Sequence, residues 1–177
     1  MTYTLYPHLL EIINMESLDK DIPIIKQLKQ IAVVLKFQSA SQIDNFFETD
    51  RDLTALVIEK EALSYYNRND YQNSLKVIIT YITLFYEIND QTIKLLVANL
   101  QCLGCMVTAR HAYLKIYQFN NQEIDCIYFA GVCAFFTGDK DDGKKLLTRF
   151  LTFRSNRKQA IIYRRYFEHS EKLIKLL

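Results

Sequence analysis

The sequence predicts an all-α protein, a helical solenoid of three degenerate helix–turn–helix repeats with further helices at both ends. The 177 residues include only four glycines and two prolines, Pro7 and Pro23. Beyond Pro23, only glycines and polar turns can therefore interrupt a helix. Three similar turn segments begin at Asn69, Gly104 and Gly138, which are 35 and 34 residues apart. That spacing is the length of a repeated helix pair.

Equivalent positions around the three turns hold residues of similar character. Each first helix has a small residue, or Val97, in one column: Ala62, Val97, Gly131. Each second helix has a small residue in another: Ser74, Ala109, Gly143. Large apolar residues form further columns: Ile58, Ile93, Ile127 and Ile78, Tyr113, Leu147. The small residues are expected to let the helices approach closely, and the large ones to fill the space between repeats.

This pattern resembles the tetratricopeptide (TPR) repeat over residues 55–153. The proline that commonly ends a TPR is missing, and we expect the polar stretches 87–90 and 120–123 to end the helices instead. The expected organisation is an N-terminal helical segment (1–54), three repeats (55–153) and a basic C-terminal capping helix (154–177).

Helices are also expected outside the repeats. One begins at Pro7 and ends near Glu16, one runs from Asp21 to Gln38, and a third begins at Ser41. The final helix is expected to run from Asn156 to Leu177. Its apolar residues would pack on the last repeat: Ile161, Ile162, Phe167, Leu173.

Charge is distributed unevenly along the chain. Residues 144–177 contain ten basic and two acidic residues, a net charge of +8, which leaves −6 for the preceding 143. The basic segment allows three interpretations: a solvated cap, a docking site for an acidic partner, or a nucleic-acid contact. The residues of this basic patch are Arg154, Arg157, Lys158, Arg164, Arg165.

No secretory signal and no apolar run of membrane-spanning length is visible in the sequence. The four cysteines are too few and too helical in context for a disulfide framework. A cytoplasmic location is therefore expected, with no membrane partner.

No catalytic constellation is apparent. The histidines, His8, His111 and His169, fall in separate predicted helices, and no phosphate-binding glycine loop or metalloprotease motif is present. The chain is therefore predicted not to be an enzyme and to need no cofactor.

Two segments superficially suggest metal sites. Cys102 and Cys105 could supply half a zinc site, but small buried residues beside a turn explain them better. Residues 139–143 are acidic, but Phe150 stands where a calcium loop needs its closing Glu. We therefore expect this stretch to begin a helix, and no metal to bind.

In TPR proteins the first helices of the repeats line a concave groove. The resemblance implies groove residues in the first two repeats: Leu56, Glu59, Leu63, Tyr66, Asn67, Gln91, Lys94, Ala98, Gln101, Cys102. In the third repeat they are Asp125, Tyr128, Val132, Phe135, Phe136. An aromatic groove with few charges is typical of a partner-binding site.

The layout of N-terminal helices, three repeats and a capping helix resembles the TPR chaperones of bacterial type III secretion systems. That resemblance implies a cytosolic chaperone or adaptor that binds a protein or peptide segment, and a homodimer is possible. Two alternatives stay open: a fixed scaffold subunit of a larger assembly, and, less favoured, a nucleic-acid-binding protein using the basic C-terminal helix.

Overall fold

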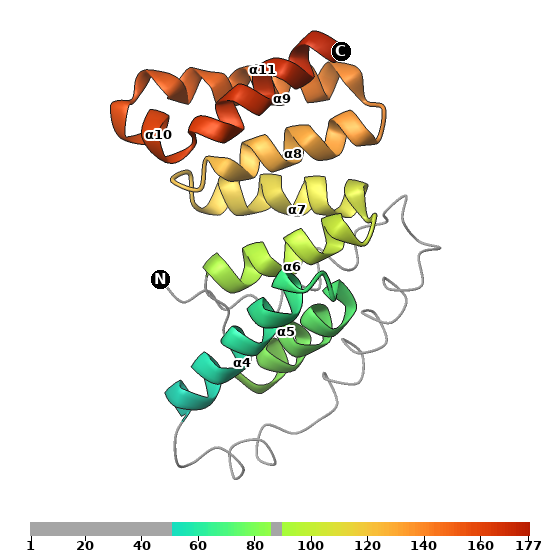
Figure 1. Cartoon of the computed structure of the whole chain (residues 1–177), viewed down its shortest axis with the longest axis vertical. Helices are drawn as coiled ribbons and strands as arrows, with labels where there is room; N and C mark the ends of the chain where they lie inside the picture. The colour runs from blue at the N-terminus through green and yellow to red at the C-terminus, as the bar shows by residue number, and fades with distance from the viewer. Residues whose placement is uncertain (1–50, 86–89) are drawn as a thin grey trace. The chain divides into compact units, whose positions relative to one another are not determined.

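The computed structural model describes residues 51–85 and 90–177, and this part of the chain is all-α, without a strand. The chain divides into two compact units, Met1–Cys105 and Met106–Leu177. The first contains, in its described part, α4 (Arg51–Asn67), α5 (Tyr71–Phe85) and α6 (Asp90–Cys102). The second contains α7 (Met106–Phe119), α8 (Asp125–Phe136), α9 (Lys140–Thr152), a 3-10 turn (Phe153–Ser155), α10 (Arg157–Ile162) and α11 (Arg164–Leu176) (Figure 1).

The predicted all-α helix-pair fold is confirmed. The division between the two units falls inside the second predicted repeat, between its two helices. The predicted domain limits at 54 and 153 stay predictions. The helices expected from Pro7, Asp21 and Ser41 lie outside the described residues.

The three repeated turns have one backbone geometry. Asn69, Gly104 and Gly138 all have positive φ, at 62°, 86° and 81°. In each turn the N–H of this residue donates to the carbonyl three residues earlier, at 2.9 to 3.2 Å. The next N–H donates to the carbonyl five residues before it, at 2.9 to 3.0 Å. This hydrogen-bond pair is the Schellman motif, which favours Gly or Asn at its left-handed position. The predicted equivalence of the three turns is therefore confirmed.

The small-residue columns pack helix against helix. In the first pair, the Ser74 hydroxyl donates to the Ala62 carbonyl across α4 and α5 at 2.8 Å, and both residues are buried. In the third pair, a Cβ added to Gly131 would lie 2.9 Å from Leu147 of α9. A Cβ on Gly143 would lie 3.3 Å from the backbone nitrogen of Phe135. These glycines therefore allow α8 and α9 to pack in close contact.

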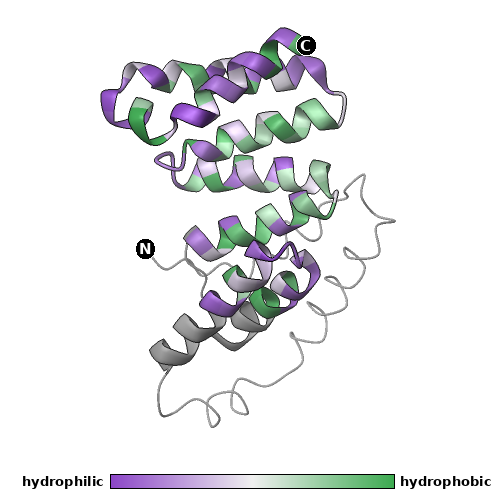
Figure 2. Ribbon diagram, viewed as in Figure 1, coloured by the Kyte–Doolittle hydropathy of each residue, from purple (hydrophilic) through white to green (hydrophobic). Residues whose placement is uncertain are grey.

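Helix α8 is apolar around most of its circumference, as Figure 2 shows by its colour. It lies between α7 and α9, and α11 covers part of the remaining surface of α8. A helix that is hydrophobic on all sides is stable in water only when it is enclosed in this way. Its neighbour α9 begins where predicted: Asp139 caps it by accepting from the Asp142 N–H at 3.3 Å.

The C-terminal segment differs from the single helix expected over 156–177. Asn156 starts a helix by accepting hydrogen bonds from the N–H groups of Lys158 and Gln159, but the helix is interrupted at Tyr163. The break places Phe167 and Leu173 in the core and leaves Ile161 and Ile162 exposed, so the prediction that these two isoleucines pack on the last repeat is wrong. Aromatic contacts of Tyr163 with Phe150 and Tyr166 accompany the change of direction.

Candidate partner-binding surface

In the N-terminal unit, α4 and α6 lie side by side, as expected for first helices of neighbouring repeats. Side-chain contacts join them. The Thr92 hydroxyl donates to the Glu59 carboxylate at 2.6 Å, and the Tyr66 hydroxyl lies 3.9 Å from the Cys102 sulfur. These contacts join the C-terminal half of α4 to the two ends of α6. Predicted inner positions of α4 and α6 are therefore adjacent.

The predicted residues on these two helices differ in exposure. Leu63 is 48% exposed, which is high for a leucine on a packed helix. Asn67 is exposed, and four others are partly exposed: Tyr66, Lys94, Ala98, Gln101. The side chain of Leu56, which lies in α4, is outside the described part. The surface combines apolar and neutral polar groups with a single lysine.

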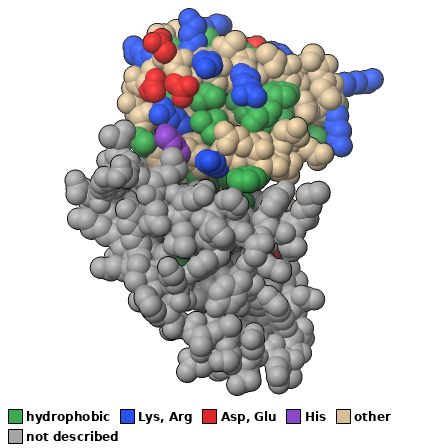
Figure 3. All heavy atoms as spheres, turned by 180° about the vertical axis from the view of Figure 1, so that it is seen from behind, with side chains coloured by type: hydrophobic (Ala, Val, Ile, Leu, Met, Phe, Trp, Pro, Cys, Tyr) green, Lys and Arg blue, Asp and Glu red, His purple; other side chains and the backbone are tan. Residues whose placement is uncertain are grey.

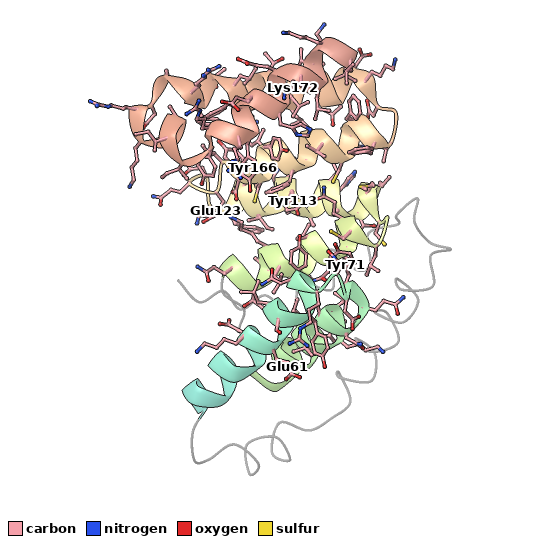
Figure 4. The ribbon with its side chains drawn as sticks, viewed as in Figure 1. Glu61, Tyr71, Tyr113, Glu123, Tyr166 and Lys172 are labelled. Carbon is pink, nitrogen blue, oxygen red and sulfur yellow. The ribbon has the colours of Figure 1, made fainter. Side chains whose placement is uncertain are left out.

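Tyr71, at the start of α5, adds to this surface and was not anticipated from the sequence (Figure 4). Its ring meets that of Tyr66 edge to face at 5.4 Å, and its hydroxyl donates to the Asn69 side chain at 2.7 Å. Loss of hydration raises the pKa of Tyr71, and the neighbouring Cys102 thiol adds to the shift. The only sequence signal was an aromatic residue just after the turn.

In the C-terminal unit, two of the predicted groove residues are buried. Tyr128 is only 7% exposed and is covered by α11, and Val132 is 6% exposed. The Tyr128 ring stacks on Tyr166 with centroids 4.6 Å apart, and its hydroxyl lies 2.6 Å from Nδ1 of His169. Burial, together with the nearby Tyr166 hydroxyl, raises the pKa of Tyr128 to about 12. This tyrosine attaches α11 to α8 in the described chain.

The same stacking continues through the unit. Tyr166 is also edge-to-face with Phe129, which in turn stacks on Tyr113 of α7 at 5.2 Å (Figure 4 labels Tyr113 and Tyr166). Phe150 of α9 stacks on Phe167 at 4.6 Å. An aromatic cluster therefore links all four long helices of this unit.

The remaining predicted residues of α8 are at its C-terminal end. Phe136 is 63% exposed, Phe135 is partly exposed, and their rings meet edge to face at 5.4 Å. Figure 3 shows that hydrophobic side chains also gather on the face of this unit turned away from the viewer in Figure 1, bordered by Lys and Arg. Exposed apolar patches of this kind commonly mark interaction sites.

All five residues of the predicted basic patch are exposed. Arg154 pairs with Glu171, and Arg164 pairs with Glu168 at 3.0 Å. Arg157, Lys158 and Arg165 form no ion pair within the described residues.

Potential metal ligands do not converge. Cys102 is exposed, whereas Cys105, Cys126 and Cys133 are buried and none is in a disulfide. Across residues 51–85 and 90–177, no three His, Cys, Asp or Glu side chains come together as a metal site would require. The acidic start of α9 is engaged differently, because Arg110 of α7 pairs with Asp139 at 2.8 Å and Asp142 at 3.5 Å. The Arg110 hydrogen bond lowers the pKa of Asp139.

None of the helices in the described part is long and apolar enough to span a bilayer.

No family model matches the sequence, and no curated protein sequence matches it either. A solved structure titled "CopN-Scc3 complex" contains a chain with a similar fold. The two chains are 18% identical, the TM-score is 0.58, and the match covers 98% of this chain and 99% of the other. At this level of identity, the similarity shows a shared fold and carries no further conclusion.

Proposed function

We propose that this chain is a non-enzymatic protein-binding module, a cytosolic chaperone or adaptor that holds a peptide segment of a partner protein. The binding residues would be the accessible ones of the predicted groove in the N-terminal unit: Leu63, Tyr66, Asn67, Lys94, Ala98 and Gln101. In the C-terminal unit, Phe135 and Phe136 would form a separate apolar contact with the partner. The observation that supports this most directly is the joined pair of α4 and α6, whose shared face includes the exposed Leu63.

The character of these residues suggests the kind of segment that would bind. Leu63 and Tyr66 offer an apolar anchor site, and Asn67 and Gln101 offer hydrogen-bonding groups beside it. With Lys94 as its only formal positive charge, the set does not form the cluster of cations that a carboxylate clamp needs. A segment with apolar anchors spaced along a helix or an extended chain would fit better.

Two likenesses support the proposal. The sequence resembles the TPR chaperones of type III secretion systems, and the similar solved chain was determined within a complex, as its title states. The buried Tyr128 and Val132 change one detail of the groove expected from the sequence. In the proposed mode of binding they stabilise α8 and α11. Leu63 and Tyr66 act as the anchors in the N-terminal unit, and Phe136 is a separate apolar contact in the C-terminal unit.

The test uses a photo-reactive amino acid inserted at single positions in the full chain. Cross-linking in the native host from Leu63 and Phe136 is expected to capture the same partner. Control insertions at Lys76 and Lys144, both exposed on the second helices α5 and α9, should capture little of it. Leu63→Glu is then expected to weaken capture about 30-fold, since an anchor residue contributes roughly 2 kcal/mol.

Three results would contradict the proposal: capture from Lys76 and Lys144 alone, unchanged capture by Leu63→Glu, or a partner that cross-links equally from every position. Because Leu63 is already half exposed, the substitution should leave the helical circular dichroism unchanged. The same purified chain also separates a chaperone from a fixed scaffold subunit. A chaperone should stay monodisperse alone and exchange its bound segment, whereas a scaffold subunit should aggregate without its partner.

A further inference from the structure

The junction of α10 and α11 presents two adjacent isoleucines to solvent. Ile161 is 71% exposed and Ile162 is 60% exposed. We call residues 157–165, which contain them, the α10 corner. Arg157 and Lys158 each lie four residues before one of the isoleucines, so each cation shares a helix face with an aliphatic side chain. Nitrogen-tipped side chains point away from the ribbon at this end of the unit (Figure 4).

The positive charge of the α10 corner is largely uncompensated. The last 34 residues contain two acids, Glu168 and Glu171, and each is already paired with an arginine. Arg157, Lys158 and Arg165 are exposed, and no carboxylate of the described residues pairs with them. An exposed apolar pair beside unpaired cations is suited to an anionic surface that also has an apolar interior.

We propose that the α10 corner is a peripheral binding site for an anionic lipid surface, which would replace the expectation from the sequence that the chain has no membrane partner. The isoleucines enter the boundary between headgroups and acyl chains, and the cations contact lipid phosphates. The small size of the apolar area favours lipid over a protein partner. Two isoleucines present on the order of 200 Å² of apolar surface, whereas a stable protein interface takes about 800 Å² from each partner. A bilayer needs no shape complementarity, so a small protruding corner suffices.

The aromatic residues near the α10 corner argue against nucleic acid. Single-stranded nucleic acids bind by stacking bases on exposed rings. The nearest rings, Tyr163 and Tyr166, stack on each other at 6.1 Å and contact Phe150 and Tyr128 inside the unit. Both tyrosines are only partly exposed and already contact other rings, whereas the exposed side chains beside the cations are aliphatic.

The test is co-sedimentation of the full chain with two kinds of vesicle, phosphatidylcholine alone and phosphatidylcholine mixed with phosphatidylglycerol. Binding is expected only to the anionic vesicles, and it should weaken as salt is added. Each cation near an anionic surface contributes about fivefold, so Arg157→Gln with Lys158→Gln should lower the partition coefficient by about 30-fold. Ile161→Ser with Ile162→Ser should lower it by at least about tenfold, because the apolar contact is lost.

The matched control is Lys144→Gln with Lys145→Gln, which removes the same charge from exposed positions of α9. This control should bind within about threefold of the wild type, because these lysines lie outside the α10 corner. An equal loss in the control, or no loss in the isoleucine variant, would overturn the proposal. The proposal would also be overturned if the chain did not bind vesicles but bound polyglutamate or a single-stranded oligonucleotide in a way that depends on the isoleucines. All variants change exposed side chains, and circular dichroism checks that they fold.

Discussion

Helices α4 and α8 hold equivalent places in the first and third helix pairs, and they differ in what covers them. Both end in the same left-handed turn, and both present a small buried residue, Ala62 or Gly131, to the helix that follows. On α4, Leu63 is half exposed. On α8, Tyr128 is enclosed by α11. The repeat therefore determines how each pair is packed internally, and the neighbouring segment determines which positions reach solvent.

The two units also use different groups to join their helices. In the N-terminal unit, the buried Asn99 of α6 donates to the Ser74 hydroxyl at 3.0 Å, and Ser74 donates on to the Ala62 carbonyl. In the C-terminal unit, glycines at the equivalent positions let the paired helices pack closely, and stacked aromatic rings fill the core. Substitutions at buried positions of the two units should separate these two modes of packing.

The largest effect is expected from Phe150→Ala. Phe150 is fully buried and stacks on Phe167, so its removal should cost about 4 kcal/mol in the free energy of unfolding. Leu75→Ala, at a fully buried position of the N-terminal unit, should cost about 3 kcal/mol. Urea unfolding measures how much free energy of unfolding each variant loses. Hydrogen exchange by mass spectrometry shows which helices lose protection. If α11 amides keep wild-type protection in Phe150→Ala, the aromatic cluster does not hold α11 in place.

A smaller loss is expected from Gly131→Ala, about 2 kcal/mol, because the new Cβ would lie 2.9 Å from Leu147. Gly138→Ala is the control for backbone strain. It has open space around the added Cβ but a φ of 81°, and should cost about 1 kcal/mol. In the N-terminal unit the reverse change, Ala62→Gly, should also cost about 1 kcal/mol. Thermal unfolding compares all three variants. A Gly131→Ala protein as stable as the wild type would mean that the Leu147 side chain or the packing of α8 on α9 can adjust at no cost.

The turns, the helix pairs and the small columns could be predicted from the sequence because they are local or strictly periodic. A left-handed residue needs Gly or Asn wherever it occurs, and close helix packing needs small residues at one fixed spacing. Asp139 likewise predicts a helix start, because its side chain accepts a hydrogen bond from a backbone N–H of the first turn.

The packing of α11 on α8 could not be predicted in the same way. Ile161, Ile162, Phe167 and Leu173 are all apolar, and composition does not say which of them face the core. The break at Tyr163 changes the helix phase between the first two and the last two, and it accompanies ring contacts with Phe150, distant in sequence. An arrangement set by contacts between segments far apart in the chain leaves no periodic signal.

An effect as small as that of Gly138→Ala, and the most specific to the covered helix, is expected from Tyr128→Phe. The change removes the hydrogen bond to His169 and keeps the ring, so it should cost about 1 kcal/mol near neutral pH. An unfolded tyrosine loses its proton near pH 10, whereas Tyr128 in the folded chain keeps it until about pH 12. Between these values the unfolded chain binds fewer protons than the folded one. The wild-type free energy of unfolding should therefore fall as pH rises from 10 to 12.

Tyr128→Phe cannot ionise at this position, so its stability should fall less over the same interval, and the gap between the two proteins should narrow. His169→Asn separates the two causes. It weakens the hydrogen bond but leaves Tyr128 buried, and because burial is the larger cause of the raised pKa, the fall between pH 10 and 12 should persist. Urea unfolding at intervals of pH gives the three curves. Parallel curves for wild type and Tyr128→Phe would mean that Tyr128 ionises like a hydrated tyrosine, and that α11 does not enclose it in solution.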